Sequence, residues 1–287
     1  MQSKTIIVTG ANSGIGFSSA LKLAKLGHNV VMMCRNAQRG ETARQNIIEQ
    51  APHSMIDLIL VDLSSQQSIR DGVAQFKNRH PQLNVLINNA ANFDITQKQP
   101  IITADGVEAI FATNHLGTFL LTQLLLPILK DSVPARVINI ASKGLIAHPF
   151  LNIVFDNLNG QKKYSPGGAY YHSKLAQIMF TYDLAKKLEG TGVAVNCIRV
   201  PAVRLDNGRY DHIPSFLRAL YRFKMIFSLT TDQMADVYVK LAVDPEFEGV
   251  TGAYIDENCQ KVKSSKHSYD RETWEHLWKI SMNMTGL

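Results

Sequence analysis

Short runs of aliphatic and β-branched residues recur along the chain, and the stretches between them carry apolar residues at helical spacing. The runs are continuous rather than alternating, which is typical of strands buried on both faces of a parallel sheet. The predicted strands are residues 4–8, 29–33, 55–61, 83–87, 136–140, 193–199 and 252–255. The predicted helices are residues 14–26, 38–50, 65–79, 104–130 and 167–189.

Strand and helix therefore alternate over most of the chain, which predicts an α/β fold. We expect a single doubly wound, Rossmann-type domain with a mainly parallel seven-stranded sheet and helices on both faces. The length of 287 residues would allow two domains. However, no internal repeat, low-complexity segment or linker divides the sequence, so one domain over residues 1–287 is the better interpretation.

Composition and charge exclude several classes of protein. With 45% hydrophobic and 19% charged residues, the chain can bury a sizeable core and is not disordered. The net charge is +6, but the first 40 residues contain five basic residues and no acidic residue, while the remaining 247 hold 25 basic and 24 acidic residues. A nucleic-acid partner is not expected, because it would need long basic stripes. The local excess instead indicates an anion site near the N-terminal end.

Three cysteines, Cys34, Cys197 and Cys259, are far apart, and neither they nor the nine histidines show metal-ligand spacing. We therefore expect a reduced, cytoplasmic protein without a metal. Residues 4–8 are strand-like, so no secretory signal is predicted. The longest nearly apolar stretch, residues 119–129, is 11 residues long, whereas a transmembrane helix needs about 20. No transmembrane segment is expected, which leaves peripheral membrane contact open.

A glycine-rich turn follows the first predicted strand and leads into a helix. It reads Thr9-Gly10-Ala11-Asn12-Ser13-Gly14-Ile15-Gly16. Glycines let the backbone approach a pyrophosphate, and the N–H groups and dipole of the helix attract the anion. An ordinary βα turn is the alternative, but the position after the first strand of a doubly wound pattern favours a dinucleotide. The candidate cofactor residues here are Gly10, Asn12, Ser13, Gly14, Ile15 and Gly16.

The end of the second predicted strand indicates which dinucleotide binds. An NAD site typically places an acid about 20 residues past the glycines, on the ribose 2′-OH. Here Arg35 and Asn36 follow Cys34, and no acid precedes Glu41. The planar fork of Arg35 suits a 2′-phosphate, with help from Arg39. We therefore predict NADP(H); two solvated surface arginines are the alternative.

Three residues form a candidate catalytic set. Ser142 follows the strand 136–140, at the carboxyl edge of the sheet where ligands bind in this architecture. Tyr170 and Lys174 are four residues apart on a predicted helix, so they share a face. A nearby ammonium lowers the pKa of a phenol, usually about 10, and so allows proton exchange near neutral pH. Ser142 can polarise the same carbonyl. Alone, the Tyr170 and Lys174 pair would fit a solvated helix face.

These motifs occur together in a known superfamily. They are Thr9–Gly16, Asp62-Leu63, Asn88-Asn89-Ala90, Asn114, Ser142, Tyr170 and Lys174. In carrying them, the whole chain resembles the short-chain dehydrogenases/reductases. Residues 155–160, 172–176 and 277–281, and the 27 residues between Ser142 and Tyr170, resemble the retinol-dehydrogenase-like branch.

The resemblance implies roles for the matching residues. Tyr170 would be the general acid in reduction and the general base in oxidation, while Lys174 would lower the pKa of Tyr170 and hold the nicotinamide ribose. Ser142 would position the carbonyl, and Asn114 would hold a water that links Lys174 to solvent. Asp62 would contact the adenine. The implied cofactor contacts outside the glycine turn also include Leu63, Asn88, Ala90, Tyr170, Lys174, Pro201 and Val203.

Three positions depart from the family pattern. Ala91 stands where the family usually has glycine, so the turn is expected to relax slightly. Ala202 replaces the glycine of a Pro-Gly pair after the sixth strand. The threonine that usually follows, and helps hold the nicotinamide amide, is absent from the run that begins at Val203.

The segment before the last predicted strand is expected to form a substrate lid at about residues 203–230. Residues 209–229 are rich in apolar and aromatic side chains, which are interleaved with Arg218, Arg222 and Lys224. Such a surface suits an apolar substrate and shields the reaction from water. A lid that touches a membrane and a contact between copies in a homo-oligomer are the alternatives.

Together these features predict an NADPH-dependent oxidoreductase that interconverts a carbonyl, in an aldehyde or ketone, and an alcohol. The expected small-molecule substrate is apolar, and a retinoid, lipid, steroid or polyketide would fit. Two alternatives remain: a non-catalytic nucleotide-binding or scaffold protein of the same fold, and a carbon–carbon double-bond reductase using the same site.

Overall fold

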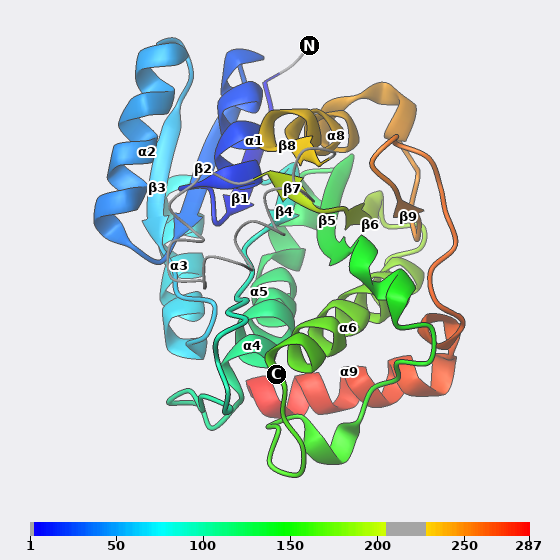
Figure 1. Cartoon of the computed structure of the whole chain (residues 1–287). Helices are drawn as coiled ribbons and strands as arrows, with labels where there is room; N and C mark the ends of the chain where they lie inside the picture. The colour runs from blue at the N-terminus through cyan, green and yellow to red at the C-terminus, as the bar shows by residue number, and fades with distance from the viewer. Residues whose placement is uncertain (1–2, 205–227) are drawn as a thin grey trace.

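The computed structural model describes residues 3–204 and 228–287, and a seven-stranded sheet lies at its centre (Figure 1). The strand order is β3-β2-β1-β4-β5-β6-β9, and every neighbouring pair is parallel. The predicted seven-stranded parallel sheet is thus confirmed. The strands are β1 (Thr5–Thr9), β2 (Asn29–Cys34), β3 (Ile56–Leu60), β4 (Val85–Asn88), β5 (Ala135–Ser142), β6 (Val193–Val200) and β9 (Tyr254–Ile255).

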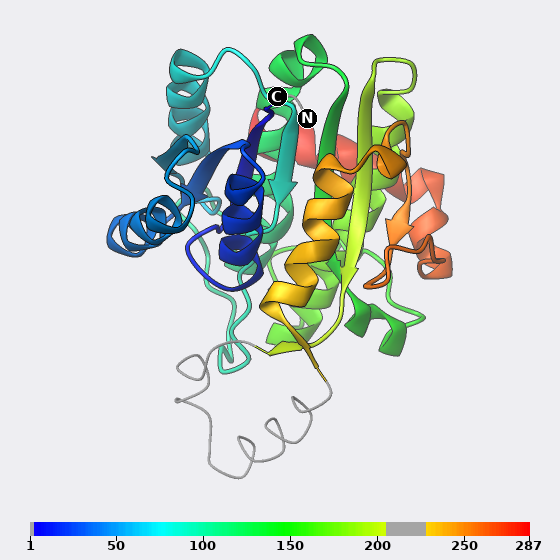
Figure 2. The same cartoon turned by 90° about the horizontal axis from the view of Figure 1, so that it is seen from above.

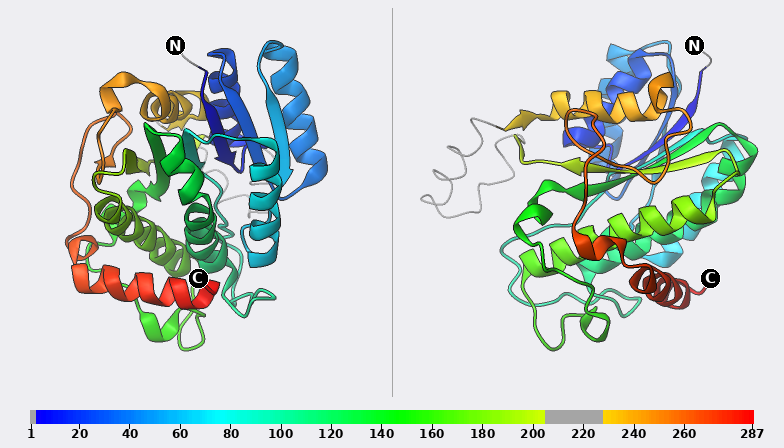
Figure 3. Two further views of the ribbon diagram at one scale, coloured as in Figure 1. Left: turned by 180° about the vertical axis from the view of Figure 1, so that it is seen from behind. Right: turned by 90° about the vertical axis from the view of Figure 1, so that its right-hand side faces the viewer.

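Helices cover both faces of this sheet, as Figures 2 and 3 show. One face carries α1 (Gly14–Lys25), α2 (Ala37–Gln50) and α8 (Thr231–Val243), and the other carries α3 (Gln66–Arg79), α5 (Gly117–Asp131) and α6 (Pro166–Lys187). Alternation along β1 divides the core, because Ile6 and Val8 pack toward α1 and α8 while Ile7 packs toward α5. A further helix, α9 (Arg271–Thr285), packs outside against α6.

The predicted helix 104–130 begins later and is not uniform. It consists of α4 (Ala109–Phe111), a π-helical turn (Ala112–Leu116) and α5. By length and composition the continuous run Ala109–Asp131 could cross a membrane, but 72% of its apolar window is buried inside the protein. A core helix has this burial, so the run is weak evidence for a membrane span.

Several elements were not among the predicted ones. They are helices α8 and α9 and a two-stranded parallel sheet of β7 (Val203–Arg204) and β8 (Leu229–Thr230). Short 3-10 turns occur at Lys143–Ala147, Phe155–Asn157, Pro245–Phe247 and Lys266–Tyr269. Most of the predicted lid, residues 205–227, lies outside the described residues.

The strand order positions the functional site. Connections from β1 run outward to β2 and β3, and the chain then returns to place β4 on the other side of β1. In such sheets the crevice between the two diverging strands, at their carboxyl ends, is where ligands bind. The glycine turn and Pro201 follow the carboxyl ends of strands β1 and β6 at this edge, and Ser142 is the last residue of β5.

Candidate active site

At each of the three glycines in the turn after β1, the backbone conformation or a close contact disfavours a larger residue. Gly10 and Gly14 have φ values of +65° and +58°, which side chains rarely tolerate. A Cβ on Gly16 would lie 2.5 Å from the Gly10 carbonyl oxygen and 2.5 Å from the Asn89 side chain. The turn therefore exposes bare backbone at the start of α1, as close approach of a pyrophosphate requires.

The N-terminus of α1 has no side-chain cap. Ser13 is the N-cap residue, but its side chain makes no capping hydrogen bond, and the first turn contains no acidic residue. On α2, by contrast, the Asn36 side chain accepts from the Arg39 N–H at 2.9 Å. The first N–H groups of a helix need a partner. At α1 they face the glycine turn, where an anion can serve as that partner.

A cleft of about 510 Å³ opens beside the turn, between α1 and α2. Six of its nine lining residues have polar side chains, and the lining includes part of the glycine turn. The lining residues are Asn12, Ser13, Gly14, Phe17, Gln38, Arg39, Thr42, Ala43 and Asn46. Arg39 thus contributes a cation to the cleft, whereas Arg35 is exposed at the end of β2 and is not among the lining residues.

The segment after β4 fastens the turn to the neighbouring strand. The Asn89 side chain donates to the Thr9 carbonyl at 2.9 Å, and the Ala90 N–H donates to the Thr9 hydroxyl at 2.9 Å. Asn88 points elsewhere: its buried side chain donates to Asn139 at 2.8 Å. Asn89, for which the sequence suggested no separate role, is therefore the amide that braces the glycine turn.

Asp62 and Leu63 lie in the turn after β3. The Asp62 carboxylate accepts from the Ser64 N–H at 2.9 Å and from the Ser64 hydroxyl at 2.7 Å. This arrangement closes the turn locally. The start of α5 presses directly on it, because a Cβ on Gly117 would lie 2.1 Å from the Leu63 carbonyl oxygen. The adenine contacts expected of Asp62 and Leu63 stay predictions.

Lys174 is a nearly fully buried cation. Only 3% of the residue is exposed, and its ammonium donates to the Ile140 carbonyl of β5 at 2.9 Å. Burial lowers the pKa of Lys174 to about 8. The ammonium lies 5.6 Å from the centroid of the Tyr170 ring, so the predicted pair shares one helix face.

Ser142 is the last residue of β5 and the cap of the 3-10 turn that follows. Its hydroxyl oxygen accepts from the Gly144 N–H at 3.1 Å. The bond from Lys174 to Ile140, two residues earlier, holds the Tyr170 face of α6 against this end of β5. Tyr170 and Lys174 are thus neighbours beside β5, the strand that ends at Ser142, while the action of all three side chains on one substrate oxygen stays a prediction. Tyr171, the neighbouring tyrosine, packs on His148, with ring centroids 4.3 Å apart.

Asn114 sits in the π-helical turn Ala112–Leu116, a distortion that is frequent at functional sites. Its side chain holds both backbone polar groups of Asn92, accepting from the N–H at 2.6 Å and donating to the carbonyl at 3.0 Å. It also donates to the Ser173 hydroxyl at 3.0 Å. The Gln177 side chain donates to the Asn114 carbonyl. Sequence reasoning gave Ser173 and Gln177 no role, because these contacts join distant segments.

Two departures from the family pattern carry no backbone strain. Among the described residues, Cys259 is the only non-glycine with positive φ, so Ala91 and Ala202 lie in ordinary conformations. Alanine at position 91 in place of the family's glycine is therefore accommodated without a positive φ angle. Pro201 follows β6, and Val203 begins β7 and is buried.

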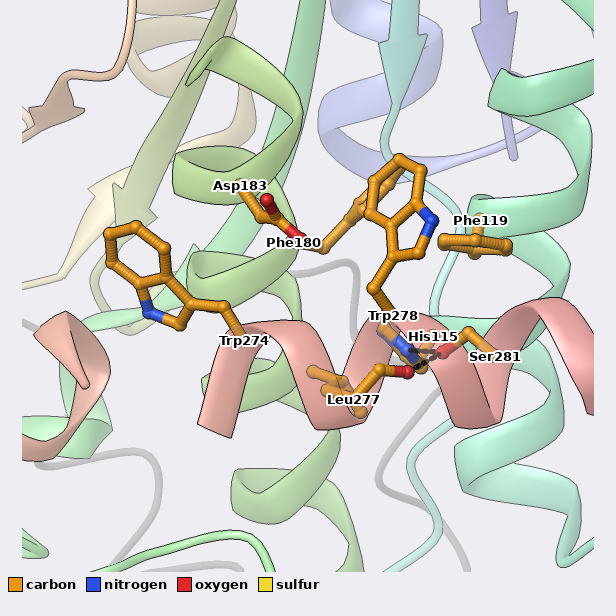
Figure 4. A pocket seen from close by; sticks show the side chains of 8 residues that line it. All are labelled: His115, Phe119, Phe180, Asp183, Trp274, Leu277, Trp278 and Ser281. Atoms are coloured by element: carbon orange, nitrogen blue, oxygen red, sulfur yellow. Dashed lines mark hydrogen bonds between the residues drawn. The ribbon is translucent and has the colours of Figure 1, made fainter. Parts of the chain in front are cut away.

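A second pocket is too small to hold a cofactor. It lies between α5, α6 and α9 (Figure 4), and its volume of about 10 Å³ matches roughly one water molecule. His115 bonds to the Ser281 hydroxyl there at 2.8 Å, which ties α9 to the π-helical turn. Burial lowers the pKa of His115 to about 3, so this contact is made by a neutral ring.

Known proteins share these features. The short chain dehydrogenase family profile matches residues 4–210, which contain the glycine turn and the catalytic set. Retinol dehydrogenase 14 of Homo sapiens is 38% identical over 301 residues, covering 100% of this chain and 88% of that protein. An uncharacterized protein from Mycobacterium paratuberculosis has a TM-score of 0.73 at 27% identity, covering 99% of this chain and 93% of its own. L-Sorbose reductase from Gluconobacter frateurii, solved with NADPH and L-sorbose, shares the fold with a TM-score of 0.73 at 18% identity, covering 92% of this chain and 98% of its own.

Proposed function

The chain belongs to the short-chain dehydrogenase family, in its retinol-dehydrogenase-like branch, and from this premise we propose that it interconverts an apolar aldehyde or ketone and an alcohol with NADP(H). Proteins of this family are oxidoreductases that bind a nicotinamide dinucleotide. The observation that carries the proposal is the buried ammonium of Lys174 beside the Tyr170 ring, at the end of β5 where Ser142 stands.

The catalytic residues act on the carbonyl oxygen. When bound, the cofactor supplies or removes a hydride at the carbonyl carbon. The Ser142 hydroxyl hydrogen-bonds the oxygen and polarises the carbonyl. Tyr170 donates a proton to that oxygen in reduction and accepts it in oxidation. Lys174, with a pKa of about 8, is mostly protonated at neutral pH, and its charge stabilises the Tyr170 phenolate between turnovers.

The proposed preference for NADP(H) is supported by two arginines near the glycine turn. Arg39 lines the cleft beside the glycine turn, and Arg35 stands at the carboxyl end of β2. Both precede Glu41, the first acidic residue of the chain. A guanidinium can bind a phosphate through two parallel hydrogen bonds, whereas an NAD site would place a carboxylate here.

Replacing either arginine by aspartate is expected to change cofactor preference. Arg35→Asp and Arg39→Asp should each lower the ratio of kcat/KM for NADPH to that for NADH by at least about tenfold, because a charge-assisted phosphate contact becomes a repulsion. Arg271→Asp, which makes the same charge change at the start of α9, is the control and should leave the ratio unchanged. An unaltered ratio in both test variants would refute the 2′-phosphate role.

The activity itself is tested by supplying NADPH with a panel of apolar carbonyls. Retinal, decanal and a steroid ketone represent three of the four substrate classes that the sequence leaves open. We expect at least one to be reduced, with loss of NADPH absorbance and an equal amount of alcohol. Product analysis separates this from carbon–carbon double-bond reduction, which would yield a saturated carbonyl. NADPH binding without turnover of any member of the panel would instead support a non-catalytic role.

A further inference from the structure

The loop after β4 lays an aromatic ring on the catalytic tyrosine. Phe93 and Tyr170 have ring centroids 4.4 Å apart and ring planes inclined by 38°. This separation lies just below the usual range of aromatic pairs, about 4.5–7 Å, so the two rings are in direct contact. Phe93 is still 39% exposed, so its ring both contacts Tyr170 and presents apolar surface to solvent.

Hydrogen bonds fix the backbone that carries Phe93. The Asn114 side chain holds the N–H and the carbonyl of Asn92, the residue immediately before Phe93. Asn114 also donates to the Ser173 hydroxyl, which in turn donates to the Tyr170 carbonyl at 2.7 Å. The contacts therefore close a circuit from Tyr170 through Asn114 to Phe93 and back to the Tyr170 ring. Asn114 thus contacts both the backbone before Phe93 and Ser173 in the second turn of α6.

A bound substrate is expected to contact the surface formed by the Phe93 and Tyr170 rings. The Tyr170 hydroxyl has to reach the carbonyl oxygen, so the groups attached to the carbonyl carbon lie within a few ångströms of the Tyr170 ring and its cover. An apolar group placed there exchanges water for contact with the Phe93 ring. A short or polar substrate gains little from that contact.

We propose that Phe93 is a specificity-determining residue that selects carbonyl substrates with a large apolar group beside the reacting carbon. The inference rests on the proposed function and narrows its substrate class. Phe93 takes no part in proton transfer. It contributes binding surface, and its contact with Tyr170 excludes water from one side of the phenol ring.

Substitution of Phe93 gives a kinetic test with two matched aldehydes. With the NADPH-loaded enzyme, Phe93→Ala should lower the ratio of kcat/KM for 2-naphthaldehyde to that for propanal by about tenfold, as expected for losing contact with an aromatic ring. The change should fall on KM for 2-naphthaldehyde, with kcat for propanal kept within about threefold of the wild-type value. Phe93→Trp, which keeps a flat ring, should restore the ratio.

Phe150 offers a matched control on the loop after β5. It is 88% exposed, so Phe150→Ala removes an equal side chain from the surface, and the ratio should stay within about twofold of the wild type. A Phe93→Ala enzyme with an unchanged ratio would overturn the proposal. Equal losses for both aldehydes would also overturn it, because they would indicate a purely structural role.

A binding measurement separates this proposal from the proposed activity. The fluorescence anisotropy of 2-naphthamide, an aromatic amide that the enzyme cannot reduce as an aldehyde, reports binding to the NADP⁺-loaded protein without turnover. Phe93→Ala should weaken binding about tenfold, while Phe93→Trp and Phe150→Ala should not. If the wild type binds 2-naphthamide through Phe93 yet reduces no carbonyl, the proposed activity is refuted while the role of Phe93 in binding apolar groups is supported. Equal affinity of Phe93→Ala and the wild type would refute the role of Phe93.

Discussion

The Tyr170→Phe enzyme is expected to turn over at least about 10³-fold more slowly than the wild type while binding NADPH with nearly unchanged affinity. General acid–base catalysis by a placed side chain contributes on the order of 10²–10⁴ to a rate, and a phenyl ring has no proton to give. The substitution keeps the ring, so the contacts with Phe93 and the Lys174 ammonium survive. The fold and the cofactor cradle after β1 should therefore be unaffected.

Tyr171→Phe is the matched control for this loss. It removes the same hydroxyl from the next residue, whose ring packs on His148 and lies against Gly144. Its turnover should stay within about threefold of the wild type. Single-turnover reduction and NADPH fluorescence titration distinguish chemistry from binding. A Tyr170→Phe enzyme that retains more than about a tenth of the activity would remove Tyr170 from the proton-transfer step.

The parts of the site that depend on short stretches of chain could be predicted from the sequence. The glycine turn is defined by local backbone requirements, namely positive φ at Gly10 and Gly14 and close approach at Gly16. Tyr170 and Lys174 lie one helical turn apart, so their shared face follows from spacing alone. The strand pattern likewise predicted a parallel sheet, since buried strands are continuous apolar runs.

Contacts between distant segments could not be predicted in this way. The contact of the Phe93 ring with the Tyr170 ring depends on how the loop after β4 meets helix α6. The hold of Asn114 on Asn92 depends on a π-helical turn, and no local signature in the sequence marked that turn. Arg39 lines the cleft from the first turn of α2, and the position of that turn beside α1 is set by the tertiary packing of the two helices.

Of the two helices that were not predicted, α8 has a local signal in the sequence, whereas the position of α9 depends on tertiary packing. The first turn of α8 carries a capping box in which the Thr230 side chain accepts from the Gln233 N–H and the Gln233 side chain accepts from Thr230. This Thr-x-x-Gln signature could have been found in the sequence. The position of α9 depends on packing against α6, where Lys187 lies 4.7 Å from the Trp278 ring centroid. Only the tertiary structure reveals that contact.

Lys174→Met is expected to lower activity by about 10²–10⁴ and yet raise the stability of the cofactor-free protein at pH 7. Lys174 is buried with one described protein acceptor, the Ile140 carbonyl, and no carboxylate contributes to its pKa shift. An apolar side chain of similar volume removes the desolvation penalty of the ammonium. Loss of activity together with a gain in stability is the expected result when a buried charge is retained for function and destabilises the fold.

The pH dependence of this gain follows from the lowered pKa. The unfolded chain holds the Lys174 proton up to about pH 10.5, whereas the folded protein releases it near pH 8. Between these values the unfolded state binds more protons, so wild-type stability rises with pH. Below pH 8 both states are protonated and the full penalty, on the order of 3 kcal/mol, is present. The advantage of Lys174→Met should therefore be largest at pH 7 and shrink toward pH 10.

Urea unfolding of both proteins at pH 7 and pH 10 measures this difference, with Lys25→Met as the control. Lys25 is exposed on α1, so its replacement should change the free energy of unfolding at pH 7 by less than about 0.5 kcal/mol. A Lys174→Met protein that is less stable than the wild type at pH 7 would show that the ammonium is well compensated in the fold. In that case the Lys174 ammonium would have two roles. It would support catalysis, and it would also stabilise the contact between α6 and β5.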